Sequence, residues 1–226
     1  MENLKAKISE VFFSIQGEGV YIGYPQLFIR FWDCNLKTCS FCDTKKQDYL
    51  EYSAEDLAHK ISDLGKRYHS ISLTGGEPLM EVDFLEKFLM NFKDGKKVYL
   101  ETNGTLPKAL EKIINYVDIV AMDIKLPSST GLGSFWEEHR KFLLIGWEKQ
   151  VFVKIVITKQ SELKDFQKAL EIILSIDPMI PLIIQPDSRN MDKELIDKVL
   201  SFQEEAFQSL MYVRVIPQIH KYMGVR

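Results

Sequence analysis

The sequence has little cysteine, and what it has is concentrated in one place. Its 226 residues include three cysteines, Cys34, Cys39 and Cys42, all within the stretch CNLKTCSFCDT. An odd number is at odds with a framework of paired disulfides. The chain also lacks any run near the ~18 apolar residues of a membrane span, and its N-terminus lacks the apolar core of a signal peptide. We therefore expect a cytoplasmic protein without a membrane partner, whose clustered thiols bind metal or do chemistry.

The sequence also lacks an excess of basic charge. It has 29 Lys and Arg against 32 Asp and Glu, a net charge of −3, so no nucleic-acid partner is expected. Internal repeats, low-complexity tracts and Pro/Gly/Ser-rich linkers are absent as well. With 46% hydrophobic and 27% charged residues, the composition is that of an ordinary globular protein. The length favours one domain over residues 1–226, with enough chain to bury a substantial core.

Short apolar runs alternate with amphipathic stretches, which predicts an α/β fold of repeated βα units around a parallel sheet. Ser53, followed three residues later by Asp56, predicts a capping box at the start of the first helix. The segment 126–139 is the most loop-like part of the interior. The expected strands are 26–32, 70–74, 97–102, 118–124, 151–158, 181–185 and 212–216, and the expected helices are 53–68, 81–92, 106–116, 161–175 and 191–202.

The residues with distinctive chemistry follow these predicted strands. Cys34 comes after 26–32, the sequence GGEP after 70–74, and the pair Asn103–Gly104 after 97–102. Lys125 and the sequence QPDS end two later strands in the same way. Because the carboxyl ends of parallel strands meet at one rim, these pieces of chain are predicted to converge there.

The cysteine cluster allows three interpretations. Free cysteines are often small core residues, but three in one short polar segment make that reading weak. A structural zinc site needs a fourth ligand, and the four histidines, His59, His69, His139 and His220, all lie far from the cluster in sequence. A [4Fe–4S] cluster is usually held by four thiolates, so three would leave one iron open for chemistry. The residues alone leave the zinc site open beside the iron–sulfur cluster.

Taken together, the cysteine cluster, an aromatic residue before its last cysteine, and GGEP after the next strand resemble the radical S-adenosylmethionine (SAM) superfamily. The resemblance implies an incomplete TIM-type barrel of parallel strands with outer helices. It also implies that Cys34, Cys39 and Cys42 hold a [4Fe–4S] cluster whose open iron chelates SAM, which is then cleaved to a 5′-deoxyadenosyl radical. The spacing here is C-x4-C-x2-C, one residue longer than the usual first interval.

Three further segments narrow the resemblance to one family. The sequences FFSIQGEGVYIGYPQLFIRF, CDT and VRVIPQIHKYMGVR are similar to those of the 7-carboxy-7-deazaguanine synthases, and the likeness runs essentially end to end. It implies ring contraction of 6-carboxy-5,6,7,8-tetrahydropterin with release of ammonia, on the route to queuosine and other 7-deazapurines. It further implies Mg²⁺, a reducing partner such as flavodoxin or ferredoxin, and a homodimer.

The resemblance also implies roles for individual residues, with Arg30 as the anchor of the substrate carboxylate, Thr44 as a Mg²⁺ ligand, and no protein side chain as general acid or base. A planar guanidinium suits a carboxylate, and the apolar setting LFIRFW favours a ligand-facing Arg30 over a surface cation. The implied substrate contacts are Ile15, Gln16, Gly17, Glu18, Arg30, Thr74, His220 and the terminal carboxylate of Arg226. The implied SAM contacts are Phe41, Cys42, Asp43, Gly75, Gly76, Glu77, Asp123, Ile124, Lys125, Gln185, Pro186, Asp187 and Ser188.

Two alternatives remain at this point. A radical SAM activase of a glycyl-radical enzyme would act on a large protein and would have no need of Arg30, Thr44 or the C-terminal tail. A zinc-stabilised binding module would use the three cysteines and one histidine, and would not be an enzyme.

Overall fold

The seven predicted strands are all present in the computed structural model, which describes residues 4–36, 39–42, 48–65, 67–92 and 95–225. Their ends agree with the prediction to within one residue. They pair in parallel in chain order. These strands are β2 (Pro25–Phe31), β4 (Ser70–Gly75), β5 (Lys97–Thr102), β6 (Ile119–Asp123), β7 (Gln150–Ile157), β8 (Leu182–Pro186) and β9 (Val213–Val215).

Two further strands extend one edge of the sheet and were not predicted. β1 (Lys5–Ile15) pairs antiparallel with β2, and β3 (Leu50–Ser53) pairs antiparallel with β1. The sheet order is β3-β1-β2-β4-β5-β6-β7-β8-β9. The two edge strands, β3 and β9, lie at opposite ends of this order, so the barrel is open, as the resemblance implied. Both missed strands lack the continuous apolar run that marks a buried parallel strand.

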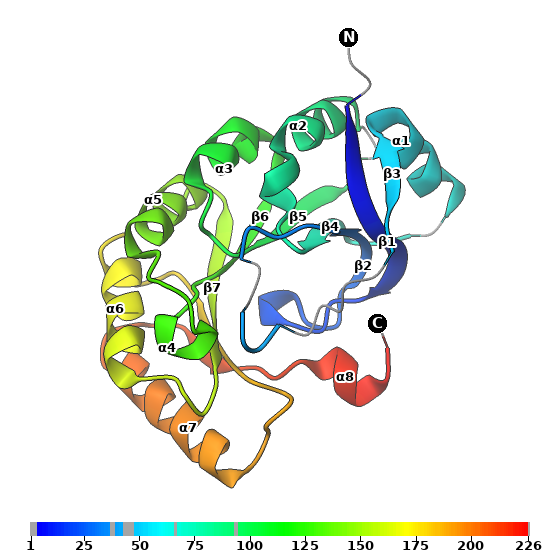
Figure 1. The fold of residues 1–226 in the computed structure, drawn as a ribbon. Coiled ribbons are helices and arrows are strands. Elements are labelled where there is room, and N and C mark those ends of the chain that lie inside the picture. Colours follow the sequence, from blue (N-terminus) through cyan, green and yellow to red (C-terminus); the bar gives the residue numbers. More distant parts are fainter. Residues whose placement is uncertain (1–3, 37–38, 43–47, 66, 93–94, 226) are drawn as a thin grey trace.

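The helices of the chain follow one another around the outer side of the curved sheet (Figure 1), except for the last one, which contacts the loop after β1. Ser53 caps the first of them by accepting the N–H of Asp56 at 3.1 Å, as predicted. They are α1 (Ala54–Asp63), α2 (Val82–Asn91), α3 (Pro107–Ile113), α4 (Pro127–Thr130), α5 (Trp136–Gly146), α6 (Leu163–Leu174), α7 (Lys193–Phe207) and α8 (Ile219–Met223), with short 3-10 turns η1 (Gly19–Tyr21), η2 (Pro78–Glu81) and η3 (Ile114–Tyr116).

The segment 126–139, expected to be a loop, contains α4 and the start of α5. Pro127 at the first turn of α4 has a backbone angle that suits a helix start, and Gly131 ends that helix at φ +74°. In α5, His139, Phe142 and Leu143 recur at helical spacing and are buried. The loop prediction was wrong because SSTGLG masked the start of this amphipathic pattern.

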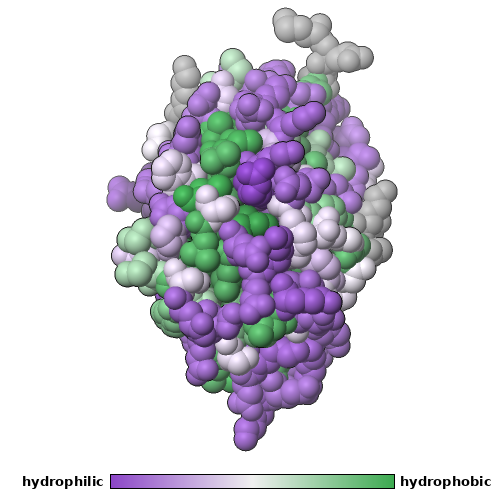
Figure 2. All heavy atoms as spheres, turned by 90° about the vertical axis from the view of Figure 1, so that its left-hand side faces the viewer, coloured by the Kyte–Doolittle hydropathy of each residue, from purple (hydrophilic) through white to green (hydrophobic). Residues whose placement is uncertain are grey.

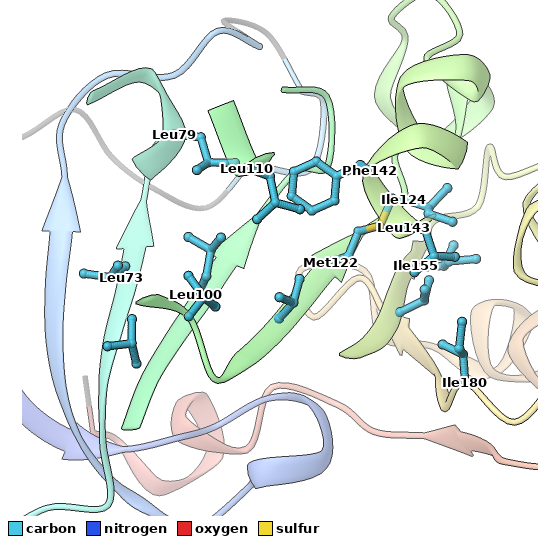
Figure 3. Close-up of a cluster of buried hydrophobic side chains, with 14 of the residues drawn as sticks. Leu73, Leu79, Leu100, Leu110, Met122, Ile124, Phe142, Leu143, Ile155 and Ile180 are labelled. Atoms are coloured by element: carbon cyan, nitrogen blue, oxygen red, sulfur yellow. The ribbon is translucent and has the colours of Figure 1, made fainter. Parts of the chain in front are cut away.

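The main core, or outer core, lies between the sheet and these helices. Leu73, Leu100, Met122 and Ile155 project from four neighbouring strands toward helix residues such as Phe142 (Figure 3). Each is fully buried, and burial of one such side chain contributes about 1.5–3 kcal/mol. The side chains next to them in sequence point to the opposite face of the sheet, because direction alternates along a strand.

The outer surface of the helices is largely hydrophilic, with a band of apolar residues (Figure 2). Exposed apolar side chains of the chain include Leu144, Trp147, Leu174 and Met179. No helix in the described part of the chain is both long and apolar enough to cross a bilayer.

Candidate active site

The inner face of the sheet opens, at the carboxyl ends of the strands, into a cavity of about 530 Å³. The segments that follow different strands meet here, as predicted from their positions directly after the strands. Eighteen of the residues proposed from the sequence line this cavity. They are Ile15, Gln16, Gly17, Glu18, Arg30, Cys34, Cys39, Phe41, Cys42, Thr74, Gly75, Gly76, Asp123, Lys125, Gln185, Pro186, Asp187 and His220.

The three cysteines lie together at one side of this cavity. Cys34 and Cys39 are partly buried, and Cys42 is exposed. The Cys42 N–H donates to the Cys39 carbonyl at 3.0 Å, and the Leu36 N–H donates to Cys34 Sγ at 3.4 Å. Burial, helped by the nearby Glu77 and Cys39, raises the pKa of Cys34 to about 11, although the Leu36 hydrogen bond opposes the shift. A bound metal ion would hold such thiols as thiolates.

The glycine pair at the end of β4 allows the cysteine loop to lie directly against this strand. Gly75 has φ +115°, and a Cβ there would lie 2.3 Å from the Phe31 carbonyl oxygen. A Cβ on Gly76 would lie 1.9 Å from the Asp33 carbonyl oxygen. Only glycine fits at both positions, and the cysteines are placed beside β4 as a result.

Glu77 has a different position from the one proposed. It is fully buried and does not line the cavity. Its carboxylate accepts the Leu79 N–H at 3.2 Å, the Thr102 hydroxyl at 2.9 Å and the Asn103 N–H at 2.8 Å. Burial raises its pKa to about 7, although these bonds oppose the shift. Here Glu77 joins η2 to the end of β5, so its placement does not support a contact with SAM.

Two other proposed SAM contacts also lie off the cavity wall. Ile124 points into the outer core (Figure 3) and is buried there. The Ser188 hydroxyl donates to Gln218 Oε1 at 2.7 Å and accepts from Lys221 Nζ at 2.8 Å. Three further proposed residues, Asp43, Thr44 and Arg226, lie outside the described residues.

The wall formed by β6 and β8 contains buried acceptors that lack a partner in the described part of the chain. These are Asp123 Oδ1 and Gln185 Oε1. The other oxygen of Asp123 is 2.8 Å from Lys125 Nζ, and this ammonium lies 4.9 Å from the centre of the Phe41 ring. A buried acceptor without a donor is costly, so this wall fits a ligand that carries hydroxyl or amino donors.

On the opposite wall the polar groups bind one another. Gln16 Nε2 donates to Glu101 Oε1 at 2.8 Å, and the Thr74 hydroxyl donates to Glu101 Oε2 at 2.6 Å. Arg30 Nε contacts Glu10 Oε2 at 3.1 Å, and its guanidinium lies 5.7 Å from the centre of the Phe12 ring. This wall therefore presents a held carboxylate and a held guanidinium to the cavity.

A buried ion pair connects the two walls. Lys154 on β7 contacts the Glu18 carboxylate, and its Nζ is 3.7 Å from Asp123 Oδ2. Burial alone would raise the pKa of Glu18, but the Lys154 ammonium and the Gln218 hydrogen bond lower it to about 2. The pKa of Lys154 is raised, because Glu18 and Asp123 outweigh its own burial. Both groups are therefore charged at neutral pH.

A sequence model described as the radical SAM superfamily matches residues 32–142. The 7-carboxy-7-deazaguanine synthase of Geobacter sulfurreducens is 40% identical, with 97% of each chain covered, and that of Archaeoglobus fulgidus is 32% identical over 99% of this chain and 100% of the relative. The crystal structure of QueE from Escherichia coli has the same fold. The match has a TM-score of 0.60 at 21% identity and covers 95% of this chain and 98% of that one.

The chain belongs to the 7-carboxy-7-deazaguanine synthase family.

Membership confirms the radical SAM assignment and the enzyme class that the motifs predicted. A [4Fe–4S] cluster and SAM are the cofactors of this superfamily, and the structure fits both. Three thiols reach the cavity beside a glycine-lined strand end, and two buried acceptors without a partner among the described residues, Asp123 Oδ1 and Gln185 Oε1, belong to residues of its wall. Among the described residues, no set of three Cys, His, Asp or Glu side chains forms a metal site of its own. The three cysteines are among these residues, so they do not surround a single ion as a zinc site requires, whereas the thiolates of a [4Fe–4S] cluster bind separate irons.

Sequence reasoning missed several residues of the cavity wall, notably Tyr99, Glu101, Phe152, Lys154 and Gln218. A usable signal existed for two of them. Glu101 and Lys154 are charged residues inside the apolar strands KVYLET and VFVKIVIT, where burial demands a partner or a ligand.

Proposed function

We propose that this protein converts 6-carboxy-5,6,7,8-tetrahydropterin to 7-carboxy-7-deazaguanine with release of ammonia. The observation that carries the proposal is the full-length match to synthases of this name, combined with a cavity that brings three cysteines close to a polar wall. Loss of ammonia alone balances the atoms, so the ring contraction needs no net oxidant. The product class places the enzyme in the synthesis of queuosine and related 7-deazapurines.

Cys34, Cys39 and Cys42 would hold the [4Fe–4S] cluster. The cluster and SAM together supply the reducing electron and the radical that abstracts hydrogen from the substrate. The protein's part is to orient the cofactor, and the cavity offers a distinct set of groups for it. The proposed SAM contacts that line the cavity are Phe41, Cys42, Gly75, Gly76, Asp123, Lys125, Gln185, Pro186 and Asp187.

The opposite wall would bind the pterin. The pyrimidine edge of a pterin carries N–H donors, which suit the Glu101 and Glu18 carboxylates, while the Gln16 amide has both a donor and an acceptor. Arg30 would pair with the substrate carboxylate, and its contact with Glu10 fixes the guanidinium in advance. Ile15, Gly17, Thr74 and His220 complete this side of the cavity.

Aromatic residues close the space between these polar groups. Phe12, Phe28, Tyr99 and Phe152 all line the cavity, and the first two stack with ring centres 5.2 Å apart. Such a lining excludes water from a reactive intermediate and holds the substrate in one orientation. Positioning is the main contribution that this arrangement makes to the reaction.

Further parts of the proposal rest on family likeness. We propose Mg²⁺ bound by Thr44 and the substrate carboxylate, the terminal carboxylate of Arg226 as a substrate contact, and Asp43 beside SAM. We also propose one radical SAM domain over residues 1–226, a cytoplasmic homodimer, and reduction by a flavodoxin or ferredoxin. Replacement of Thr44 by Val should raise the Mg²⁺ concentration needed for half-maximal turnover.

The deciding experiment is an anaerobic assay of the reconstituted protein with the tetrahydropterin, SAM, Mg²⁺ and dithionite. The expected result is the deazaguanine product with release of ammonia. A colourless protein that keeps one zinc ion after iron–sulfur reconstitution would remove the proposal. A brown protein that cleaves SAM without converting the pterin would retain the cofactors and reject the substrate.

A further inference from the structure

The segment that follows β9 runs beside the loop after β1 (Figure 1), and its residues Gln218 and His220 line the cavity. The Ile219 N–H donates to the Gly17 carbonyl at 2.9 Å. The next residue, His220, lies so close that a Cβ on Gly17 would be 2.1 Å from its Nδ1. The start of α8 is therefore fixed against the substrate side of the cavity.

Gln218, just before α8, joins two loops that come from opposite parts of the chain. Its Nε2 donates to Glu18 Oε1 at 2.6 Å, and its Oε1 accepts the Ser188 hydroxyl at 2.7 Å. Glu18 precedes η1 on the pterin side, and Ser188 ends the turn after β8 on the SAM side. One amide thus connects the two halves of the site, and only 8% of its residue surface is exposed.

Ser188 is bound to the C-terminal segment at a second point. Lys221 Nζ donates to the same hydroxyl at 2.8 Å. The three residues before Ser188, beginning with Gln185, all line the cavity, whereas Ser188 does not. A ligand that shifts this turn would act on the C-terminal segment through Ser188.

We propose that Gln218 is a positioning residue that couples occupation of the SAM turn, residues 185–188, to closure of the segment 216–225 over the substrate. Gln218 has no contact with the reacting atoms in this scheme. It transmits the position of Ser188 to Glu18, and it holds His220 at the cavity. The role in pterin binding rests on the proposed function, whereas the effect of SAM on the segment does not.

The coupling works in both directions, because a change in affinity at one site caused by a ligand at another is reciprocal. SAM should strengthen pterin binding, and the pterin should strengthen SAM binding. When the amide is removed, each ligand should bind as though the other were absent. The two sites should otherwise keep their own contacts.

The first test needs no pterin. Hydrogen exchange of residues 216–225 is measured anaerobically on the cluster-loaded protein, with and without SAM. SAM should slow exchange of this segment in the original protein and should have little effect in Gln218→Ala. Gln208→Ala is the matched control, since Gln208 is exposed, directly follows α7 and does not line the cavity. Equal protection by SAM in Gln218→Ala and the original protein, or no protection in either, would overturn the proposal.

The second test measures pterin affinity by calorimetry without reductant, so that no turnover occurs. SAM should tighten binding by about fivefold or more in the original protein, the lower end of typical allosteric couplings, and by less than about twofold in Gln218→Ala. Ser188→Ala should behave like Gln218→Ala, and the double variant should be no worse than either. Additive losses would mean that the two residues act separately, which contradicts the proposal.

The two tests separate this inference from the proposed function. If the original protein binds no pterin and makes no product, the proposed function fails, and the exchange experiment alone decides the coupling. If product forms and SAM tightens pterin binding equally in Gln218→Ala and Gln208→Ala, the function stands and the role of Gln218 is rejected.

Discussion

Neighbouring residues on the same strands serve the two faces of the sheet in different ways. On β5, Leu100 is fully buried against the helices, while Glu101 lines the cavity. On β6 and β7, Met122 and Val153 lie in the outer core, while the next residues, Asp123 and Lys154, face the cavity. One step along a strand changes an apolar group in the core to a charged group in the site. Stability and chemistry are therefore encoded by alternate residues, and substitutions should separate them.

The largest difference between the effect on activity and the effect on stability should come from Cys39→Ala, at the rim of the inner face. Two thiolates are too few to retain the cluster, so iron content and SAM cleavage should fall to background. The unfolding midpoint of the metal-free protein in urea should stay close to that of the original, because Cys39 is not part of the outer core. Iron analysis and an anaerobic SAM-cleavage assay check the first expectation. Retained cleavage would contradict the assignment of the cluster ligands.

Lys154→Met should affect both stability and function, because Lys154 is a charged residue of the inner face that the fold itself depends on. Removal of one partner from a buried ion pair typically costs about 3–5 kcal/mol, and the Lys154 side chain is only 16% exposed. Glu18 and Asp123 would lose their shared cation. Urea unfolding of the metal-free protein at pH 7 measures this loss, and Glu18→Gln in the same chain should recover part of it.

The Lys154 variant should also have a different pH dependence. In the original protein the pKa of Glu18 is lowered from 4.5 to about 2, so its contribution to stability is present above pH 4.5 and is lost as the pH falls toward 2. In Lys154→Met, burial acts without the cation and raises the pKa of Glu18. In the variant, protonation of Glu18 therefore removes the cost of its buried charge at a higher pH than in the original protein. The stability difference between the two proteins should therefore shrink as the pH falls below about 5, and a constant difference would argue against the ion pair.

The sequence contained most of this arrangement in a readable form. Buried parallel strands are apolar runs with turn residues after them, which is why all seven were predicted to within a residue. The rule that such strands share a functional rim correctly predicted that Cys34, Lys125 and Gln185 lie at one cavity. The alternation of side chains along a strand would have added Glu101 and Lys154 to the predicted site, because both occupy strand positions that point to the inner face of the sheet.

Other features depend on contacts that sequence patterns do not record. Glu77 and Ser188 were proposed as SAM contacts from the motifs GGEP and QPDS, yet their polar atoms bind Asn103 and Gln218 rather than facing the cavity. The pairing of Glu18 with Lys154 joins residues 136 positions apart. β1 has mixed polarity because one edge of the sheet is only partly covered, so it gives no apolar run to detect.

A matched pair on β5 tests the comparison most directly. Leu100→Ala should destabilise the protein by about 2–5 kcal/mol, because it leaves a cavity in the outer core, and kcat/KM of the folded enzyme should change by less than about threefold. Glu101→Gln should cost only about 1 kcal/mol, since it keeps the shape and one acceptor for Gln16 or Thr74. Its kcat/KM for the pterin should nevertheless fall by about tenfold or more, the factor expected for a lost charged contact. Equal effects of the two changes on both measurements would break the comparison.

The smallest expected effect concerns how the cysteine loop is held, at Asn35, the first residue of the lengthened interval between Cys34 and Cys39. Asn35 Oδ1 accepts from Asn103 Nδ2, and Asn35 Nδ2 donates to Thr105 Oγ1, both at 2.8 Å. This double contact ties the loop to the end of β5 and does not involve the outer core.

Asn35→Ala should therefore lower the unfolding free energy by about 1 kcal/mol, in keeping with the loss of two neutral hydrogen bonds at a partly exposed site. The cluster should be lost several times faster to an iron chelator, because a loosened loop releases its thiolates more often. Asn115→Ala, at an exposed asparagine in η3, is the control for the substitution itself. Chelation at an unchanged rate in Asn35→Ala would mean that the other contacts of the loop hold it, namely its packing on the glycine pair of β4 and the bonds of Ser40 to Ser129 and Arg189. The position of the cysteines would then depend on contacts with β4, α4 and the turn after β8 rather than on the end of β5.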